Sequence, residues 1–242
     1  MLFARLRRSL KPLARTPLHP QWLVLRGQAA TRAAVLSAAR GLVLDIGCGD
    51  RWLSADIGTR AHYVGLDYPP TVAQGYAGAP EVFGDACDLP FGDACAELVL
   101  LLDVLEHLRA PEAALTEAVR VLKPGGRLVL QVPFLYPVHD APNDYRRWTQ
   151  DGLRLLLAQH GLAASEETVQ GHPLETAASL MAIALAKAGL DTLTRRRLAL
   201  PLLPLLVLAI PCTNLGGWLL ARLLPADPFM PMGYRLIATK TA

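Results

Sequence analysis

Two glycines that follow an acidic residue at the end of an apolar run are the first residues able to bind a ligand. Residues 41–50 read Gly-Leu-Val-Leu-Asp-Ile-Gly-Cys-Gly-Asp, so that Asp45 precedes Gly47 and Gly49. Such a run is typical of a buried strand that ends where backbone approaches a ligand, because glycine allows close contact. A carboxylate at Asp45 attracts a cation and repels a phosphate. The stretch therefore favours a positively charged ligand.

A dinucleotide-binding turn is the main alternative for these glycines. Its fingerprint, G-x-G-x-x-G, needs a third glycine so that the following helix packs closely and faces a pyrophosphate. In the matching frame, which begins at Gly47, that glycine is replaced by Trp52. The replacement argues against a nicotinamide-dependent oxidoreductase. On this stretch alone, a glycine-rich turn without any ligand also stays open.

Three further aspartates follow predicted strands. Asp67 ends a second predicted strand at residues 61–67, where a carboxylate can accept hydrogen bonds from both hydroxyls of a ribose. The alternative is that Asp67 is an exposed loop aspartate. Asp85 follows a short third strand at residues 81–83, and Asp103 follows a fourth at residues 97–102. In a parallel sheet, the carboxyl ends of strands form the ligand crevice.

The stretches around these aspartates resemble four motifs of the class I S-adenosylmethionine-dependent methyltransferases. Residues 42–50 are similar to the first motif, although Arg51 replaces a further glycine. Residues 84–91 are similar to G-D-A-x-x-L-P-F, and residues 103–107 keep the V-L-E-H ending of another motif. The fourth is L-K-P-G-G before an apolar strand at residues 127–133. Residues 95–97 depart from the usual S-F-D. The resemblance covers about residues 41–133.

The resemblance implies that the chain is an enzyme with S-adenosylmethionine as its cofactor. Matched by position, Asp85 takes the adenine amino group, the Ala86 amide meets the adenine ring, and Asp45 lies near the methionine end. We expect the donor site to contain Asp45, Gly47, Cys48, Gly49, Asp67, Tyr68, Asp85, Ala86 and Asp103. The alternative of another class is a non-catalytic binding or assembly subunit that keeps the fold.

The acceptor is expected to meet residues 134–149, which are rich in aromatic, charged and imidazole groups. They resemble the Y-P-x-H…P-x-D-Y-x-R-x-T stretch of methyltransferases associated with polysaccharide and lipid pathways. A hydroxyl acceptor must lose its proton, and imidazole titrates near neutral pH. His139 is the first candidate base and His107 the second; a structural role is the alternative for each. Arg146 and Arg147 either bind an anionic acceptor or pair with Asp144.

The elements that position these residues predict an α/β fold. Apolar strands alternate with helices predicted at residues 27–40, 111–122 and 150–160. Pro111 and Thr149 are typical helix starts, and Gly161 is typical of a helix end. With strands at residues 162–170 and 233–240, the resemblance implies a doubly wound, Rossmann-like sheet of seven mostly parallel strands, the last one antiparallel. A hydrophobic helical insertion precedes that last strand.

Cysteine usage and charge limit the compartment and the partners. The four cysteines show no C-x-x-C pair, so we expect free thiols in a reducing compartment and no metal site. The first 44 residues contain no acid but eight basic residues. Residues 1–26 are expected to be a basic arm at an anionic membrane surface, with a solvated tail as the alternative. Nucleic acid is not expected, because the basic residues stay at one end of the chain and few aromatic residues are interleaved with them.

Residues 198–221 carry no charge and are long enough to cross a membrane. Pro201, Pro204 and Pro211 interrupt them, and a single crossing would separate the last strand from its sheet. We therefore expect a shallow helical hairpin within one leaflet, with a buried oligomer interface or subdomain core as the alternative. The expected domains are a methyltransferase domain at 27–173 and 226–242, and a membrane-contacting insertion at 174–225. The expected location is the cytoplasmic face of a membrane, and the expected acceptor is a small or lipid-linked molecule.

Overall fold

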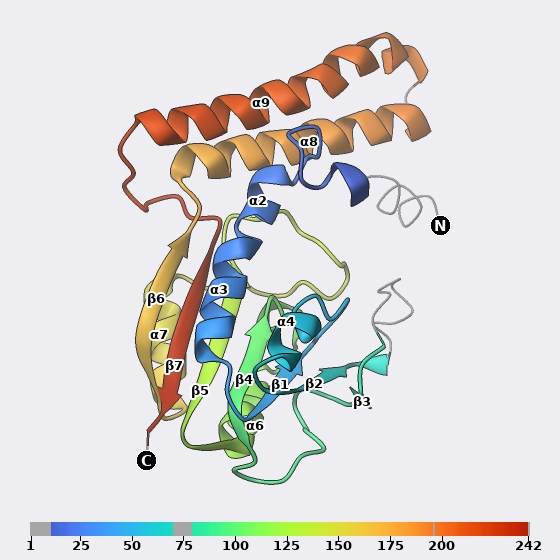
Figure 1. Cartoon of the computed structure of the whole chain (residues 1–242). Helices are drawn as coiled ribbons and strands as arrows, with labels where there is room; N and C mark the ends of the chain where they lie inside the picture. The colour runs from blue at the N-terminus through green and yellow to red at the C-terminus, as the bar shows by residue number, and fades with distance from the viewer. Residues whose placement is uncertain (1–10, 70–78, 196, 242) are drawn as a thin grey trace. The chain divides into compact units, whose positions relative to one another are not determined.

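The computed structural model describes residues 11–69, 79–195 and 197–241, and they form two compact units (Figure 1). The sheet unit contains Ala30–Phe134, Val138–Val169 and the chain from Gly233. The helical unit contains the chain up to Ala29, Leu135–Pro137 and Gln170–Met232. The first ten residues of the predicted basic arm lie outside the described residues, and the domain boundaries drawn from the sequence stay a prediction.

A seven-stranded sheet, ordered β3-β2-β1-β4-β5-β7-β6, forms the centre of the sheet unit. The strands are β1 (Leu42–Ile46), β2 (His62–Asp67), β3 (Val82–Phe83), β4 (Ala96–Leu102), β5 (Leu122–Pro133), β6 (Leu162–Gln170) and β7 (Gly233–Lys240). The neighbouring pairs from β3 to β5 are parallel, and β7 runs antiparallel to β5. The predicted α/β class, the mostly parallel sheet and the antiparallel last strand are confirmed.

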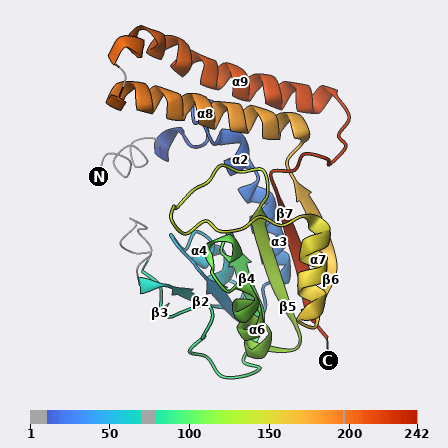
Figure 2. The ribbon, with the colours of Figure 1, turned by 180° about the vertical axis from the view of Figure 1, so that it is seen from behind.

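Helices cover both faces of the sheet (Figures 1 and 2). On one face, α3 (Gln28–Ala38) and α4 (Ser54–Gly58) pack against alternate strand residues such as Val43. On the other face, α6 (Pro111–Val121) and α7 (Gln150–Gln159) pack against the intervening residues such as Leu44. Successive side chains of a strand point to opposite faces, so both faces of a parallel sheet must be apolar. This explains why the central strands β1 and β4 read as nearly continuous apolar runs.

The helix boundaries follow the predicted capping residues. Pro111 occupies the first turn of α6, where a missing amide hydrogen costs no hydrogen bond. The Thr149 side chain accepts a hydrogen bond from the Gly152 amide at 3.1 Å and begins α7. Gly161, after the end of α7, has a φ of 68°. α4 has only five residues, as the short connection between β1 and β2 requires.

The helical unit is built around a hairpin of α8 (Pro173–Arg195) and α9 (Leu203–Leu223), joined through the 3-10 helix η3 (Arg197–Leu202). The helices approach closely where a Cβ on Gly217 would lie 2.3 Å from the Ala178 Cβ. The N-terminal segment also belongs to this unit, because α2 (Trp22–Arg26) packs its Trp22 against Trp218. A second tie is made by Asn214, whose amide donates to the carbonyls of Pro17 and His19.

The hairpin expected within residues 198–221 is wrong in its placement. That stretch forms η3 and one long helix, and the partner of α9 is α8. Pro201 lies in η3, and Pro204 lies in the first turn of α9, where proline removes no helical hydrogen bond. Only Pro211 lies inside the helix, and it does not end it. Two of the three prolines therefore mark the start of α9 rather than a turn within it.

Candidate functional site

The turn after β1 has the backbone geometry that its glycines predict. Gly47 and Gly49 have φ angles of 73° and 51°, in the left-handed region that favours glycine. A Cβ on Gly47 would lie 2.6 Å from a methyl carbon of Val104, so no larger residue fits without movement. The amides of Gly47 and Cys48 both donate to the carbonyl of Leu66 in β2. The turn is thereby fixed at the point where the sheet order reverses beside β1, which is where this type of sheet binds ligands.

Arg51 explains how the turn does without the further glycine of the first motif. Its φ is 54°, so the backbone keeps the left-handed conformation although the residue has a side chain. Such a conformation costs a non-glycine residue about 1–3 kcal/mol. The guanidinium of Arg51 pairs with Glu81 and donates to the carbonyl of Ala79 at 2.9 Å. These contacts offset part of that cost and tie the turn to the segment before β3.

Asp45 is buried below the glycine turn, with 5% of its surface exposed. The hydroxyl of Tyr63 donates to its carboxylate at 2.7 Å. Burial raises the pKa of Asp45 to about 6, an effect that the hydrogen bond from Tyr63 partly opposes. A cationic ligand nearby would favour the charged form. The neighbouring Cys48 is also buried, and burial raises the pKa of its thiol to about 12, so it stays protonated.

Asp67 lies beside this turn at the end of β2. Its buried carboxylate accepts hydrogen bonds from the amides of Gly49 at 2.8 Å and Tyr68 at 2.7 Å. Each carboxylate oxygen can accept a further hydrogen bond, so Asp67 can still bind the two hydroxyls of a ribose. The side chain of Tyr68 itself is exposed.

The remaining predicted donor residues follow β3 and β4. Asp85 is exposed and accepts a hydrogen bond from the Cys87 amide at 2.8 Å, while Ala86 is buried. Asp103 has a φ of 57° and accepts from the Gln131 side chain at 2.9 Å. All nine predicted donor residues thus lie in or directly after four neighbouring strands. The acidic set and the glycine turn fit a nucleoside ligand with positive charge, and the role of each residue stays a prediction.

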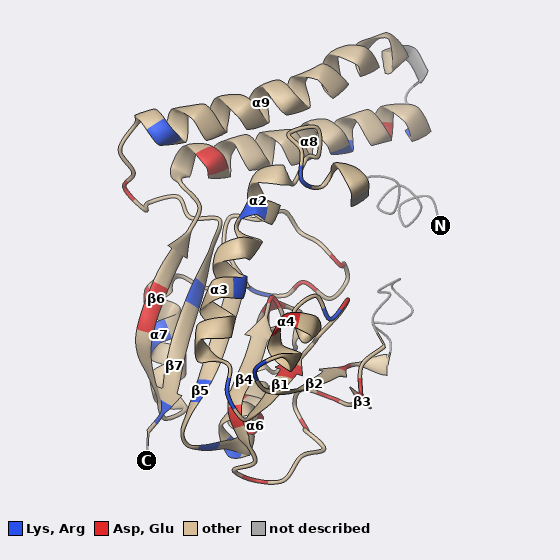
Figure 3. Ribbon diagram, in the orientation of Figure 1, with Lys and Arg blue, Asp and Glu red and all other residues tan. Residues whose placement is uncertain are grey.

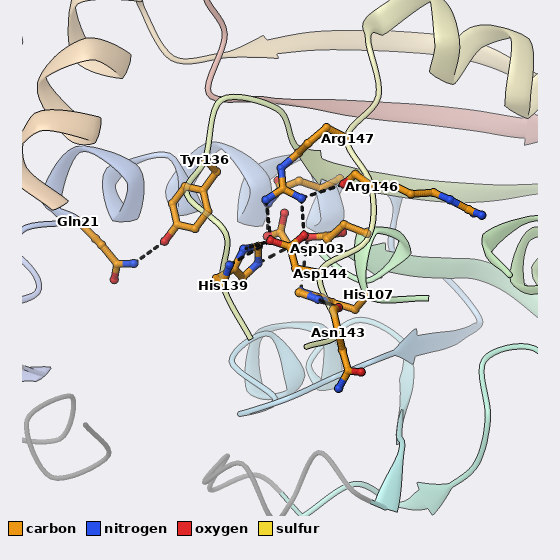
Figure 4. Close-up of polar contacts among 11 residues, drawn as sticks. Gln21, Asp103, His107, Tyr136, His139, Asn143, Asp144, Arg146 and Arg147 are labelled. Atoms are coloured by element: carbon orange, nitrogen blue, oxygen red, sulfur yellow. Dashed lines mark hydrogen bonds and ion pairs between the residues drawn. The ribbon is translucent and has the colours of Figure 1, made fainter. Parts of the chain in front are cut away.

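A second cluster joins η2 (Leu105–His107) to the loop after β5 (Figure 4). The imidazoles of His107 and His139 meet edge to face, with ring centroids 4.8 Å apart. Their Nε2 atoms lie 3.8 Å and 4.0 Å from the Oε1 atom of Glu106. The loop is held to η2 because the Tyr145 amide donates to the Glu106 carbonyl at 2.8 Å. The two predicted candidate bases are therefore brought together, and Glu106 lies between them.

The far side of each imidazole ring has its own partner. The Nδ1 atom of His107 lies 2.7 Å from the carbonyl oxygen of Asn143. The Nδ1 atom of His139 lies 3.2 Å from a carboxylate oxygen of Asp144, which also accepts from the His139 amide at 3.0 Å. These contacts favour the tautomer with the proton on Nδ1 in both rings.

Of the two arginines in this loop, Arg147 pairs with Asp144, and both of its terminal nitrogens take part. The Arg147 guanidinium holds the pKa of Asp144 well below its usual range, at about 2. Arg146 extends toward Glu112, with 3.5 Å between charged atoms. Of the two roles predicted for Arg147, the structure therefore supports pairing with Asp144.

Glu106 is the residue of this cluster to which the sequence assigned no role. Its side chain is fully buried, and neither carboxylate oxygen has a hydrogen-bond partner among the described residues. Burial, and next the charge of Asp103, raise the pKa of Glu106 to about 9. The only signal for it in the sequence was its place in the V-L-E-H motif. Periodicity places an acidic residue of a short helix on the surface by default, and only the fold shows its burial.

The helical unit exposes an apolar surface on α9. Both α8 and the segment Ala199–Leu223 are long and apolar enough to cross a membrane. In the most apolar stretch of the second segment, which contains α9, only 6% of the residues are buried. Figure 3 shows almost no charge along α9, which carries Arg222 alone. Its exposed side chains include Leu205, Val207, Leu208, Leu215, Leu219, Leu220 and Leu223. Length and composition by themselves do not distinguish a crossing from a surface contact.

Comparisons with known proteins identify the family of the chain. Residues 44–130 match the model of a methyltransferase domain family. Over 156 residues, the chain is 31% identical to an O-methyltransferase from Aspergillus nomiae, covering 55% of this chain and 69% of that one. A demethylmenaquinone methyltransferase from Clavibacter sepedonicus is 34% identical over 109 residues, which cover 42% of this chain and 44% of that one. The chain spans less than half the length of several curated relatives that it matches.

Solved structures show the same fold. An S-adenosylmethionine-dependent methyltransferase from Archaeoglobus fulgidus superposes with a TM-score of 0.55 at 18% identity, covering 89% of this chain and 93% of that one. The [4+2]-cyclase SpnF superposes with a TM-score of 0.54 at 19% identity, covering 88% and 80%. A fold shared with a cyclase does not specify methyl transfer, so the family is assigned from the sequence relatives. On their evidence, the chain belongs to the class I S-adenosylmethionine-dependent methyltransferases, enzymes whose methyl donor is S-adenosylmethionine.

Proposed function

We propose that this methyltransferase methylates a hydroxyl oxygen of a small or lipid-linked acceptor at a membrane surface. The observation that carries the choice of oxygen is the orientation of His139 by Asp144, with 3.2 Å between their facing atoms. Methyl transfer to a hydroxyl breaks the sulfur–methyl bond, forms an oxygen–methyl bond and releases the hydroxyl proton. An imidazole oriented by a carboxylate is suited to assist that release.

The position of the cluster supports an acceptor site beside the donor. Glu106 and His107 follow the predicted donor residue Asp103 by only a few positions, and His139 lies in the loop after β5, the strand next to β4. Loops at the carboxyl ends of such strands line the ligand crevice. On this proposal, Asp67 binds the ribose, Asp85 and Ala86 bind the adenine, and Asp45 lies at the methionine end. The protein would then hold the two reactants in line.

The names of the relatives support the acceptor only as a class. One relative is an O-methyltransferase, and others are demethylmenaquinone methyltransferases. The acceptor that such a name gives is the acceptor of the relative. This chain covers less than half of the demethylmenaquinone methyltransferase. We infer from the second name that a small molecule such as a quinone is compatible with the shared domain.

Membrane contact is supported by the apolar surface of α9. Leu205, Leu208 and Leu223 are each more than 60% exposed, and a soluble monomer seldom exposes so many large apolar side chains along one helix. An amphipathic or apolar helix can lie in the headgroup region without crossing. We propose such monotopic contact at the cytoplasmic face; a surface that pairs with another protein chain is the alternative outcome of the tests below.

The experiment for the proposed function uses labelled S-adenosylmethionine, a membrane extract and the purified full-length chain. We expect one labelled product in which the methyl group is bound to oxygen. His139→Ala should lower its formation about 100-fold while donor affinity, measured by calorimetry, stays within about twofold. His62→Gln, at the exposed start of β2, is the matched control and should retain activity. Donor binding without any product across extracts would favour the non-catalytic subunit, and a product methylated on nitrogen or carbon would exclude the oxygen acceptor.

A further inference from the structure

We propose that Glu106, His107 and His139 bind a divalent metal ion of the zinc or manganese type, which activates the acceptor oxygen. This deepens the proposed function and rests on it for the identity of the acceptor atom. It also changes the role of His139, which is a metal ligand rather than the base when the ion is bound. Three observations on the described residues support this site, whose ligands include no cysteine.

The first observation is the spacing of the three side chains. One possible ligand atom from each lies within 4.8 Å of the others. The distances of 3.8 Å and 4.0 Å from Glu106 Oε1 to the two Nε2 atoms are too long for hydrogen bonds. Ligands bonded to one zinc ion at about 2.0–2.2 Å lie roughly 3.4 Å from each other. Small side-chain movements therefore bring all three onto a common ion.

The second observation is the state of Glu106. Its side chain is fully buried, yet neither oxygen accepts a hydrogen bond within the described part of the chain. A buried carboxylate without a partner is costly, and buried polar groups that remain unsatisfied call for an explanation. A cation between the two imidazoles would supply the missing partner. No other buried carboxylate in the described residues lacks partners for both of its oxygens.

The third observation is the set of contacts behind the imidazoles. His107 directs Nδ1 toward the Asn143 carbonyl, and His139 directs Nδ1 toward Asp144, which Arg147 holds in turn. Metal-binding histidines almost always donate their other ring N–H to a carbonyl or carboxylate, and this fixes the ring orientation. In both rings the remaining nitrogen, Nε2, is the one that faces Glu106. The partners that a metal site needs behind its ligands are thus already in place.

The ligand set indicates the type of ion and its chemistry. Two imidazoles and one carboxylate are ligands of catalytic zinc sites and of other first-row transition metals, whereas magnesium and calcium prefer oxygen ligands. Three protein ligands leave a position open for the acceptor oxygen. A bound cation lowers the pKa of that hydroxyl, so its proton passes to solvent before the oxygen attacks the methyl carbon. The sulfonium of the donor then leaves as a neutral thioether, and charge and atoms balance.

The test measures metal binding apart from catalysis. Full-length protein freed of metal with a chelator is titrated with Co²⁺, followed by visible absorption, and with Zn²⁺ by competition. We expect one equivalent per chain, weakened about 100-fold or more in Glu106→Gln and in His139→Ala. His62→Gln should bind like the unchanged protein. Calorimetric binding of S-adenosylmethionine by each variant shows that the fold is retained, because no predicted donor residue is altered.

The outcomes separate this proposal from the proposed function. Absence of saturable binding of Co²⁺, Zn²⁺ and Mn²⁺, or binding that is unchanged in both ligand variants, overturns the metal site. Oxygen methylation at full rate by the chelator-treated enzyme overturns it as well and leaves the proposed function standing. Conversely, specific metal binding without any oxygen-methylated product keeps the metal site and removes the oxygen acceptor.

Discussion

Asp45 is a buried carboxylate that opposes stability, and we predict that its charge favours binding of the donor. Its pKa of about 6 lies above the ordinary value of 3.8, so the folded state binds its proton more tightly than the unfolded state does. Stability therefore falls as pH rises from about 4 to about 6, and the loss persists above pH 6. Such a pKa corresponds to about 3 kcal/mol, an order-of-magnitude figure for this fully buried group.

Asp45→Asn should separate the two effects. An asparagine oxygen can still accept the Tyr63 hydroxyl, so we expect the variant to unfold at higher urea concentration than the unchanged protein at pH 7.5. The difference should vanish near pH 4, where the carboxyl is protonated in both states. Affinity for S-adenosylmethionine, measured by calorimetry at pH 7.5, should fall at least about tenfold, because the negative charge is lost. Unchanged affinity would contradict the placement of Asp45 at the donor. Asp45→Ala is less informative, because it leaves the Tyr63 hydroxyl without its acceptor.

At the scale of elements, the hairpin of α8 and α9 includes a very close approach of the two helices at Gly217. Gly217→Ala would bring its Cβ to 2.3 Å from the Ala178 Cβ, and the Leu174 carbonyl lies 3.1 Å away. The helices must separate to relieve the overlap, so we expect a loss of about 1–3 kcal/mol in urea unfolding. The adjacent Gly216 is the matched control, since a Cβ there meets nothing within 4 Å.

Gly216→Ala should be neutral or more stable by about 0.5–1 kcal/mol, because alanine favours helix more than glycine does. The double variant Gly217→Ala/Ala178→Gly should recover part of the lost stability, since it removes the facing methyl group. Equal stability of the two single variants at positions 216 and 217 would show that the helices do not pack at Gly217 in solution.

At the scale of the whole molecule, membrane contact predicts that vesicles of phosphatidylcholine and anionic phosphatidylglycerol float the intact protein in a density gradient. Leu208→Glu and Leu219→Glu place a charge on the exposed side of α9 and should each reduce the floated fraction. Leu155→Glu changes an equally exposed leucine on α7 and should float like the unchanged protein. Membrane contact is excluded if the intact protein stays in the soluble fraction and does not float. If the protein instead self-associates as its concentration rises, and the α9 variants do not, the surface of α9 is a protein interface.

The sequence by itself determined the fold and the methyl donor. The apolar strands, the caps at Pro111 and Thr149 and the glycines after β1 act within a few residues of themselves. Their order along the chain was sufficient to predict the α/β class. The antiparallel β7 and S-adenosylmethionine as cofactor were predicted from the resemblance of residues 41–133 to the methyltransferase motifs. The conformation of Arg51 could not be predicted, because a non-glycine residue at a φ of 54° is held there by contacts with distant Glu81 and Ala79.

Only the tertiary structure decided what depends on burial and on contacts between distant residues. The fold brings His139, in the loop after β5, next to His107, in η2 after β4. It also buries Glu106 beside both imidazoles and pairs Asp144 with Arg147. It also pairs α9 with α8, where the prolines had suggested a turn within residues 198–221. Local patterns record which residues form a strand or a helix, whereas the charge state and the partners of a side chain depend on what the rest of the chain places around it. For this reason the predicted donor residues and the two candidate histidines could be named from the sequence, whereas the burial of Glu106 beside both imidazoles could not.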